Sequence, residues 1–309
     1  MNKVLVTDSV HPLLIEGLLR RNFEVDYQPQ ITLAQVHAKI HAYIGIIINT
    51  KTVVDKTLID RAEQLQFLGR LGSGLEIIDL EYAKTKNIYC FNTPEGNRNA
   101  VAEHALALVL NLFNNINKSN NQVKEFSWLR EENRGLELDG KTIGIIGLGN
   151  TGKAFARKLQ GFDVEILAYD IEEKEFNLAE QTSLDKIYKR VDVLSIHLPL
   201  NQTTHHWLNQ ARIESFSKPI YIINTSRGKI INQVDLLKNL QNGKILGAGL
   251  DVLENEKIDV LNGQERQVLA QLNFLNNVII TPHIAGWTHE SKRKIAENIL
   301  NKIDLYMKL

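Results

Sequence analysis

The sequence predicts an α/β protein built from two domains, each a doubly wound parallel sheet. Short β-branched apolar runs alternate with longer amphipathic stretches along most of the chain, which is the pattern of a parallel sheet covered by helices. These runs form two series, separated by a long helical segment. The 309 residues also leave room for two domains of roughly 150 residues each.

The first series of apolar runs predicts four strands. They cover residues 4–8, 43–50, 67–72 and 88–93. A helix is predicted next, from about residue 101 to residue 119. We expect this helix to connect the two domains.

The second series predicts six strands, at residues 142–147, 164–170, 191–199, 220–226, 246–252 and 277–286. The last segment, residues 289–309, is predicted to be a helix. Its apolar residues recur at three- and four-residue spacing: Ile295, Ile299, Ile303 and Tyr306. Because this helix has no sheet of its own to cover, we expect it to return to the first domain. The predicted domains are therefore residues 1–99 with 285–309, and residues 100–284.

Charge and cysteine content limit the classes of partner. The chain has 36 Lys and Arg against 36 Asp and Glu, so no net field favours nucleic acid or an anionic membrane. Cys90 is the only cysteine, which excludes an intrachain disulfide and fits a reducing compartment. The longest apolar stretch, residues 105–113, is far shorter than the roughly 20 residues of a membrane-spanning helix. We expect a cytoplasmic protein whose partners are small molecules and further copies of itself.

A glycine motif predicts a dinucleotide site. Gly147, Gly149 and Gly152 form GxGxxG directly after a predicted strand and before a helical pattern. Such glycines allow a tight turn, close approach of the backbone to a pyrophosphate, and packing of the helix on the strand. The amides of Gly149, Asn150 and Thr151 would then bind the pyrophosphate, because a helix N-terminus favours an anion.

The next predicted strand ends at Asp170, about 20 residues further on. A carboxylate at this point accepts hydrogen bonds from the adenosine ribose hydroxyls. Asp170 is followed by Ile171, Glu172 and Glu173, with no arginine. A 2′-phosphate would meet negative charge, so we predict NAD rather than NADP. The alternative is that Asp170 only caps the following element. No set of histidines, acids and Cys90 has the spacing of metal ligands, so no metal is predicted.

Three further segments carry a resemblance to a known family. They are INTSRGKIIN at 223–232, GAGLDVLENE at 247–256 and ITPHIAG at 280–286. Together with GRLGSGLEIIDL at 69–80 and NTPEGNRNAVAEHALAL at 92–108, they resemble the D-isomer-specific 2-hydroxyacid dehydrogenases over essentially the whole chain. The resemblance implies a Rossmann NAD-binding domain at 100–284 and a flavodoxin-like substrate-binding domain at 1–99 with 285–309. It also implies that cofactor and substrate lie in the cleft between them.

The resemblance assigns catalysis to Arg227, Glu256 and His283. Oxidation of a 2-hydroxy acid needs a base of near-neutral pKa at the hydroxyl, and histidine suits this best. A carboxylate on the other ring nitrogen would hold the histidine, and Glu254 is close enough in sequence to be a rival for that part. The planar guanidinium of Arg227 would bind the substrate carboxylate and keto oxygen.

Other contacts are also implied by the resemblance. It places Asn97 beside the substrate and Asp251 against the nicotinamide carboxamide. The Ser73 and Gly74 amides are also expected at the substrate carboxylate, because their glycine-rich turn lets the main chain approach closely. The predicted cofactor contacts further include His197, Pro199, Thr225, His283 and Gly286. For His197, a hydrogen-bonded structural histidine is nearly as good an interpretation.

The substrate is predicted less sharply. Residues 92–108 are most similar to short phosphoglycerate dehydrogenases, so 3-phosphoglycerate is the first candidate. Asn49 and Lys51 stand where those enzymes often carry arginines, and Lys51 is a candidate phosphate contact. Hydroxypyruvate, glyoxylate and D-lactate stay open. Because the sequence ends at Leu309, no regulatory domain is expected after it.

The resemblance also implies how the protein assembles. Family members are commonly dimers built around the interdomain helix and the arm after it, here about residues 102–139, so a homodimer is expected.

The competing function is a non-catalytic NAD-binding transcriptional corepressor on the same scaffold. The intact Arg227, Glu256 and His283 set and the lack of a basic patch weigh against it.

Overall fold

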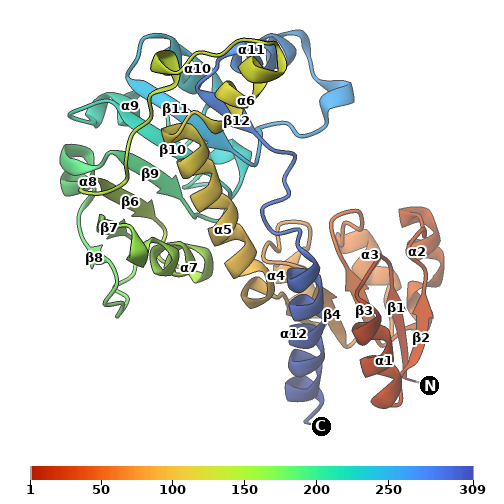
Figure 1. Ribbon diagram of the computed structural model, residues 1–309. Helices are drawn as coiled ribbons and strands as arrows, with labels where there is room; N and C mark the ends of the chain where they lie inside the picture. Colours follow the sequence, from red (N-terminus) through yellow and green to blue (C-terminus); the bar gives the residue numbers. More distant parts are fainter. Residues whose placement is uncertain (1, 309) are drawn as a thin grey trace. The chain divides into compact units, whose positions relative to one another are not determined.

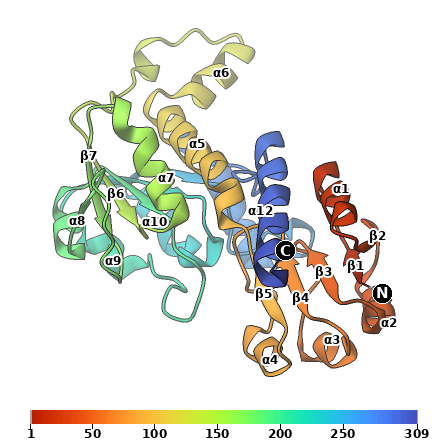
Figure 2. The same ribbon diagram turned by 90° about the horizontal axis from the view of Figure 1, so that it is seen from below.

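The computed structural model describes residues 2–308, which form two compact units. Unit 1 comprises residues 2–98 with 287–308, and unit 2 comprises residues 99–286. The domain limits predicted from the sequence, after residues 99 and 284, differ from these limits by one and two residues. Figures 1 and 2 show the elements of both units.

Unit 1 contains a parallel five-stranded sheet in the order β2-β1-β3-β4-β5. This is the flavodoxin-like order. The strands are β1 (Lys3–Val6), β2 (Glu24–Tyr27), β3 (Gly45–Ile48), β4 (Phe67–Arg70) and β5 (Tyr89–Phe91). The helices are α1 (Pro12–Arg20), α2 (Leu33–Lys39), the 3-10 turn η1 (Ile40–Ala42), α3 (Lys56–Arg61), α4 (Leu80–Thr85) and α12 (His289–Met307).

The sheet of unit 1 buries both faces. Alternate side chains of β3 point to opposite faces, so Ile46 and Ile48 join one apolar cluster and Ile47 joins the other. Helices α1 and α12 pack on the Ile47 face, and helices α2, α3 and α4 pack on the opposite face (Figure 2). The last helix of the chain therefore completes the cover of the first sheet.

Unit 2 contains a parallel seven-stranded sheet in the order β12-β11-β10-β9-β6-β7-β8, the Rossmann order (Figure 1). The strands are β6 (Thr142–Ile146), β7 (Glu165–Tyr169), β8 (Glu180–Gln181), β9 (Val193–Ile196), β10 (Ile220–Asn224), β11 (Ile245–Leu250) and β12 (Val278–Ile280). The helices are α5 (Pro94–Phe113, which begins in unit 1), α6 (Ile116–Lys124), α7 (Asn150–Lys158), α8 (Leu184–Arg190), α9 (Gln210–Ser215), α10 (Gln233–Gln241) and α11 (Gly263–Phe274). Single 3-10 turns are η2 (Glu131–Asn133), η3 (Leu159–Gly161), η4 (Gly228–Ile230) and η5 (Ile258–Val260).

The predicted fold class is confirmed, since both units are parallel α/β sheets. Three details of the prediction were wrong. The helix expected at 101–119 is two helices, α5 and α6, because Asn115 takes a left-handed conformation (φ 51°) between them. Asparagine tolerates this conformation better than most residues. Strands β2 and β8 were not predicted, because both lie at sheet edges and lack an apolar run.

Within residues 2–308, no helix combines the length and the apolar character that crossing a bilayer requires.

Candidate active site

The predicted site residues of unit 2 gather at one edge of its sheet. Parallel strands bring their carboxyl ends to the same edge, where ligands bind in doubly wound folds. A predicted site residue lies within three residues of the end of six of the seven strands: Gly147, Asp170, His197, Thr225, Asp251 and His283.

The glycine motif forms the turn between β6 and α7. Gly147 has a φ of +94°, and a Cβ there would lie 2.6 Å from the His197 carbonyl oxygen. A Cβ at Gly152 would lie 2.0 Å from the Gly147 oxygen, so α7 can approach the strand only with glycine at this position. At Gly149, by contrast, a Cβ would meet no heavy atom within 4 Å. Gly147 and Gly152 are thus required by the fold. The lack of a side chain at Gly149 leaves an open space at the start of α7, here called the cradle.

This cradle fits a dinucleotide phosphate. Gly149 is the N-cap of α7 and has no side chain to satisfy the first amides of the helix. Asn150 and Thr151 open that helix, the former exposed and the latter half-buried. The amides at a helix N-terminus and the helix dipole attract an anion.

Asp170 lies at the end of β7, beside this turn. Its Oδ2 accepts from the Leu148 amide at 2.7 Å and from the Lys174 ammonium at 2.8 Å, and Oδ1 accepts from the Glu172 amide at 3.1 Å. Burial alone would raise the pKa of Asp170, but these hydrogen bonds, that of Lys174 first, hold the pKa below its usual value. The carboxylate is therefore ionised and fixed.

Lys174 was missed in the sequence. The absence of arginine after Asp170 suggested uninterrupted negative charge, yet the Lys174 ammonium also lies 3.7 Å from Glu172. Its spacing of four residues from Asp170 was the available signal, but the segment between them is not helical, so helical spacing did not apply.

Arg227 follows β10 in a turn that Asn224 holds. Asn224 is buried; its Oδ1 accepts from the amide and hydroxyl of Ser226 at 3.0 and 2.7 Å, and its Nδ2 donates to the Arg227 carbonyl at 3.0 Å. Gly228 comes next, where a Cβ would lie 1.9 Å from the Leu253 oxygen. These contacts fix the backbone from which the half-buried Arg227 side chain emerges, and its Nη1 donates to the Ser226 carbonyl at 2.8 Å.

His283 and Glu256 form a pair. His283 Nδ1 lies 2.9 Å from Glu256 Oε2, and the two side chains are 43% and 44% exposed. The pairing leaves Nε2 as the ring nitrogen that can face a substrate. Glu254, the rival, has other partners: its Oε2 lies 2.9 Å from His206 Nε2, and its Oε1 accepts from the Gln233 amide at 2.6 Å.

Asp251 supports the loop that carries His283. Its side chain is fully buried. Oδ1 accepts from the Thr281 hydroxyl at 2.6 Å and the Ile284 amide at 2.9 Å, and Oδ2 accepts from the Ala285 amide at 2.8 Å. These bonds occupy the carboxylate with protein donors. Contact of Asp251 with a nicotinamide stays a prediction.

His197 faces the interior. It is 8% exposed, its Nε2 lies 2.8 Å from Ser195 Oγ, and its ring packs against that of Phe155. Burial lowers the pKa of His197 to about 4. These observations favour the structural interpretation over contact with the cofactor. Pro199, in the same segment, is exposed, and its carbonyl accepts from the Thr204 hydroxyl at 2.6 Å.

Thr225 and Gly286 complete the predicted contacts of unit 2. Thr225 Oγ1 is buried, and no atom of residues 2–308 serves as its hydrogen-bond partner. A buried hydroxyl of this kind usually has a partner, so a ligand atom at this position would satisfy it. Gly286 is half-buried and ends the loop that begins at Thr281.

Two of the substrate contacts predicted in unit 1, Ser73 and Gly74, lie in one turn, and Asn97 and Lys51 lie on other segments. Ser73 and Gly74 are half-buried in the turn after β4, where Gly72 has a φ of +137° and the Ser73 carbonyl accepts from Asn92 Nδ2. Asn97 Oδ1 is buried, and within the described part of the chain nothing donates to it. Lys51 is exposed, and its ammonium donates to the Pro29 carbonyl at 2.6 Å.

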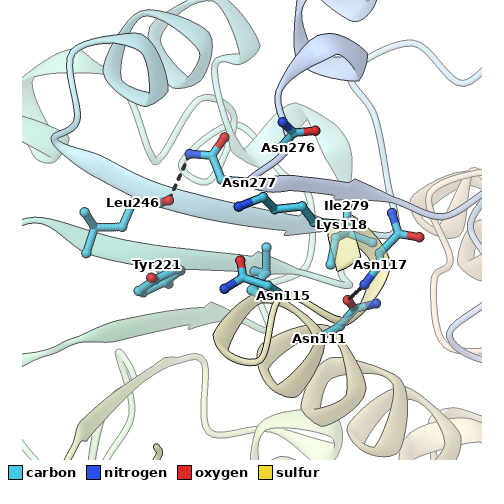
Figure 3. A pocket seen from close by; sticks show the side chains of 10 residues that line it. Asn111, Asn115, Asn117, Lys118, Tyr221, Leu246, Asn276, Asn277 and Ile279 are labelled. Carbon is cyan, nitrogen blue, oxygen red and sulfur yellow. Dashed lines mark hydrogen bonds between the residues drawn. The ribbon is translucent and has the colours of Figure 1, made fainter. Parts of the chain in front are cut away.

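A separate pocket of unit 2 contains none of these residues. Its walls come from α5, α6, β10, β11 and β12, and five asparagines face it together with Lys118 (Figure 3). The Asn117 amide donates to Asn111 Oδ1 at 2.8 Å on one side, and Asn277 Nδ2 donates to the Leu246 carbonyl at 2.9 Å on the other. Over residues 2–308, no three His, Cys, Asp or Glu side chains are grouped so that they could hold a metal ion.

Comparison with known proteins identifies the family. Residues 106–285 match the model of the D-isomer specific 2-hydroxyacid dehydrogenase, NAD binding domain. A hydroxypyruvate reductase from Thermotoga maritima is 34% identical over 259 residues, which cover 84% of this chain and 83% of that relative. A D-3-phosphoglycerate dehydrogenase from Archaeoglobus fulgidus is 31% identical over 307 residues, 97% of this chain; the chain spans only 57% of that relative.

A solved structure is similar over almost the whole chain. The D-lactate dehydrogenase from Aquifex aeolicus, complexed with NAD and lactic acid, has a TM-score of 0.86 and 29% identity. The similarity covers 99% of this chain and 96% of that structure.

Proposed function

Because the chain belongs to the family of D-isomer-specific 2-hydroxyacid dehydrogenases, which use NAD, we propose that it interconverts a D-2-hydroxy acid and its 2-keto acid. The observation that carries the proposal is the pair of His283 Nδ1 and Glu256 Oε2, 2.9 Å apart, at the carboxyl edge of the Rossmann sheet. When bound, NAD supplies the nicotinamide carbon that accepts or returns the hydride of C2.

His283 is the proposed acid and base. Oxidation of the hydroxy acid releases a proton from the C2 hydroxyl, and Nε2 takes it because Nδ1 faces Glu256. The Glu256 carboxylate keeps the ring oriented and stabilises the imidazolium that forms. In the reduction, the imidazolium returns the proton to the keto oxygen.

Arg227 is the proposed substrate clamp. Its guanidinium presents N–H donors in a planar fork that matches a carboxylate. The rigid turn built by Asn224 and Gly228 supports this part, since a clamp must not move with the substrate.

Residues of the glycine turn and the neighbouring strand ends are the proposed cofactor contacts. The open cradle at Gly149 and the amides of Asn150 and Thr151 suit the pyrophosphate. Asp170 suits the ribose hydroxyls, and the buried Thr225 hydroxyl suits a further polar group of the dinucleotide.

For the substrate we propose 3-phosphoglycerate, with phosphohydroxypyruvate as its keto acid, as the first candidate. The similarity to a D-3-phosphoglycerate dehydrogenase over 97% of the chain supports this choice. The orphan Asn97 Oδ1 supports a polar substrate group near the start of α5.

A second candidate is hydroxypyruvate, and a specific observation favours it. Asn49 stands where phosphoglycerate dehydrogenases often carry an arginine, and the Lys51 ammonium already donates a hydrogen bond to the Pro29 carbonyl. Neither side chain forms a cationic cradle for a phosphate. The hydroxypyruvate reductase relative, which the chain covers for 83% of its length, supports the same substrate.

A screen of NADH oxidation separates these candidates. The purified chain is assayed with phosphohydroxypyruvate, hydroxypyruvate, glyoxylate and pyruvate, the last for the D-lactate alternative. We expect one keto acid to be reduced with a kcat/KM at least about ten-fold above the next, a difference of ~1.4 kcal/mol in transition-state binding. Binding of NADH without reduction of any of the four would overturn the enzymatic proposal and favour the corepressor alternative.

We also propose that the chain acts as a cytoplasmic homodimer. The segment predicted as the dimer arm, within residues 102–139, exposes large apolar side chains: Ile116, Val123, Phe126, Trp128, Leu129 and Leu136. Phe126 is 100% exposed and Trp128 78%. Such a concentration of exposed large apolar side chains in one segment is typical of a protein interface.

A further inference from the structure

The loop that carries His283 holds this residue in an unusual conformation. His283 has a φ of +55°, in the left-handed region, which is unfavourable for a residue with a side chain. A conformation of this kind persists only where the surrounding structure fixes it. The direction in which the imidazole emerges therefore depends on the contacts of the loop.

Asp251 supplies most of these contacts. Besides the bonds to its carboxylate, the Asp251 carbonyl accepts from the His283 amide at 2.8 Å. The amides of three consecutive residues, His283, Ile284 and Ala285, thus donate to one residue. These three hydrogen bonds to Asp251 hold the backbone of residues 283–285 in the left-handed turn.

A third residue extends this network from α5. His104 Nε2 lies 2.9 Å from Thr281 Oγ1 and 3.6 Å from Asp251 Oδ1. The hydroxyl of Thr281 has one proton, and the 2.6 Å bond to the Asp251 carboxylate uses it. His104 must therefore donate its Nε2 proton to the Thr281 oxygen, and this fixes its tautomer.

Hydrogen bonds in this network are donated in one direction, from His104 to Thr281 and from Thr281 to Asp251. Each donor strengthens the next bond, because polarised hydrogen bonds in a buried site reinforce one another. The Asp251 side chain is fully buried and the His104 side chain is 21% exposed, so water screens the network little. His104 therefore ties helix α5 to the loop of His283.

We propose that His104 is a positioning residue for the dehydrogenase reaction: it donates to Thr281 and thereby keeps Asp251 and the left-handed turn at His283 in place. This inference rests on the proposed function, in which His283 transfers the proton. Small displacements of a catalytic group are costly, since a misplacement of about 1 Å can reduce the rate ~100-fold.

Two variants whose side-chain amides lie at different distances from the backbone test the proposal. In His104→Gln the terminal amide can take the place of Nε2 and donate to Thr281. In His104→Asn the amide is too short to do so. We expect kcat to fall about ten-fold in His104→Asn, within the range for a displaced catalytic group, and to recover most of that loss in His104→Gln. His41→Asn, a change at an exposed histidine of unit 1, is the matched control and should keep wild-type kcat.

The affinity for NADH separates positioning from general damage. We expect all three variants to bind NADH with nearly wild-type affinity, measured by fluorescence titration, because the predicted pyrophosphate and ribose contacts at Gly149 and Asp170 lie outside the network of His104. Equal kcat values for His104→Asn and wild type would overturn the proposal. So would equal losses in His104→Asn and His104→Gln.

A double substitution distinguishes this proposal from the proposed function. If His104 acts through His283, then His104→Asn should not lower kcat further in a His283→Ala background. A further ten-fold loss there would overturn the positioning role alone. Wild-type kcat in His283→Ala would overturn the proposed function instead. Should His104→Asn fail to fold, Thr281→Val removes the same bond and is expected to lower kcat in the same way.

Discussion

At the scale of single residues, burial and hydrogen bonding decide what each titratable group does. His197 and His283 are both histidines beside the strand ends of one sheet. His197 is enclosed against Ser195 and Phe155, and burial lowers its pKa to about 4. His283 is half-exposed and paired with Glu256. The first therefore stays neutral, and the second is suited to exchange protons.

His197 makes stability depend on pH. In the unfolded chain a histidine titrates near pH 6.5. The unfolded state therefore binds the extra proton between pH 6.5 and 4, and the free energy of unfolding falls as the pH falls through this window. The total loss is about 3 kcal/mol, at ~1.4 kcal/mol per pKa unit. Urea unfolding of wild type and His197→Gln at pH 7 and pH 4.5 measures this contribution, and parallel losses in both proteins would contradict it.

We predict that Asp170 sets the preference of the enzyme for NADH over NADPH. In Asp170→Ala the carboxylate that repels a 2′-phosphate is removed, while Lys174 keeps its positive charge and loses its partner. We expect the ratio of kcat/KM for NADPH to that for NADH to rise at least about ten-fold, which corresponds to ~1.4 kcal/mol. An unchanged ratio would mean that Asp170 does not contact the ribose.

At the scale of elements, apolar runs revealed the central strands but not every boundary. Strand β2 reads EVDY and is half exposed at the sheet edge, so its pattern lacks a continuous apolar run. Helix α5 begins at Pro94, earlier than predicted, because PEGNRN resembles a loop in composition. Gly96 is small for a packing reason: a Cβ there would lie 2.7 Å from Ile295 of α12. Contacts of this kind depend on distant segments and are not visible in a local pattern.

The candidate site residues likewise divide into those that a sequence motif reveals and those that it does not. The glycine turn, Arg227, Glu256 and His283 stand in recognisable segments, so the sequence could nominate them. Lys174 and Asn224 escape sequence analysis because they bond to residues two to four positions away through non-helical turns, which have no simple spacing pattern. His104 escapes it because only the folded chain brings its partner near. His104 and Thr281 are 177 residues apart in the sequence.

Two glycine substitutions in the turn between β6 and α7 distinguish a role in folding from a role in cofactor binding. Gly152→Ala places a Cβ 2.0 Å from the Gly147 oxygen and should destabilise unit 2 by several kcal/mol, on the order of an overpacked core. Gly149→Ala meets no protein atom and should leave the thermal midpoint nearly unchanged, yet weaken NADH binding about ten-fold or more through the blocked approach of the pyrophosphate. Thermal unfolding and fluorescence titration compare the two variants. Wild-type NADH affinity in Gly149→Ala would remove the cradle from the cofactor site.

At the scale of the whole molecule, the open question is assembly. Phe126 and Trp128 are too exposed for an isolated chain to gain stability from them. If they lie in a dimer interface, Trp128→Glu should place a charge there and convert the dimer to a monomer at micromolar concentration. Light scattering after size exclusion measures the mass, with Leu305→Glu, which adds the same charge at an exposed apolar residue outside the arm, as the control. A monomeric wild type, or a dimer that survives Trp128→Glu, would contradict the proposed arm.

The proposed reaction depends on proton transfer by the imidazole of His283, which Glu256 orients. The most direct test is the turnover of His283→Ala with the best keto acid of the screen, measured beside its affinity for NADH. We expect kcat to fall about 10² to 10⁴-fold, with NADH affinity nearly unchanged. Turnover at the wild-type rate by a protein that still binds NADH would contradict it.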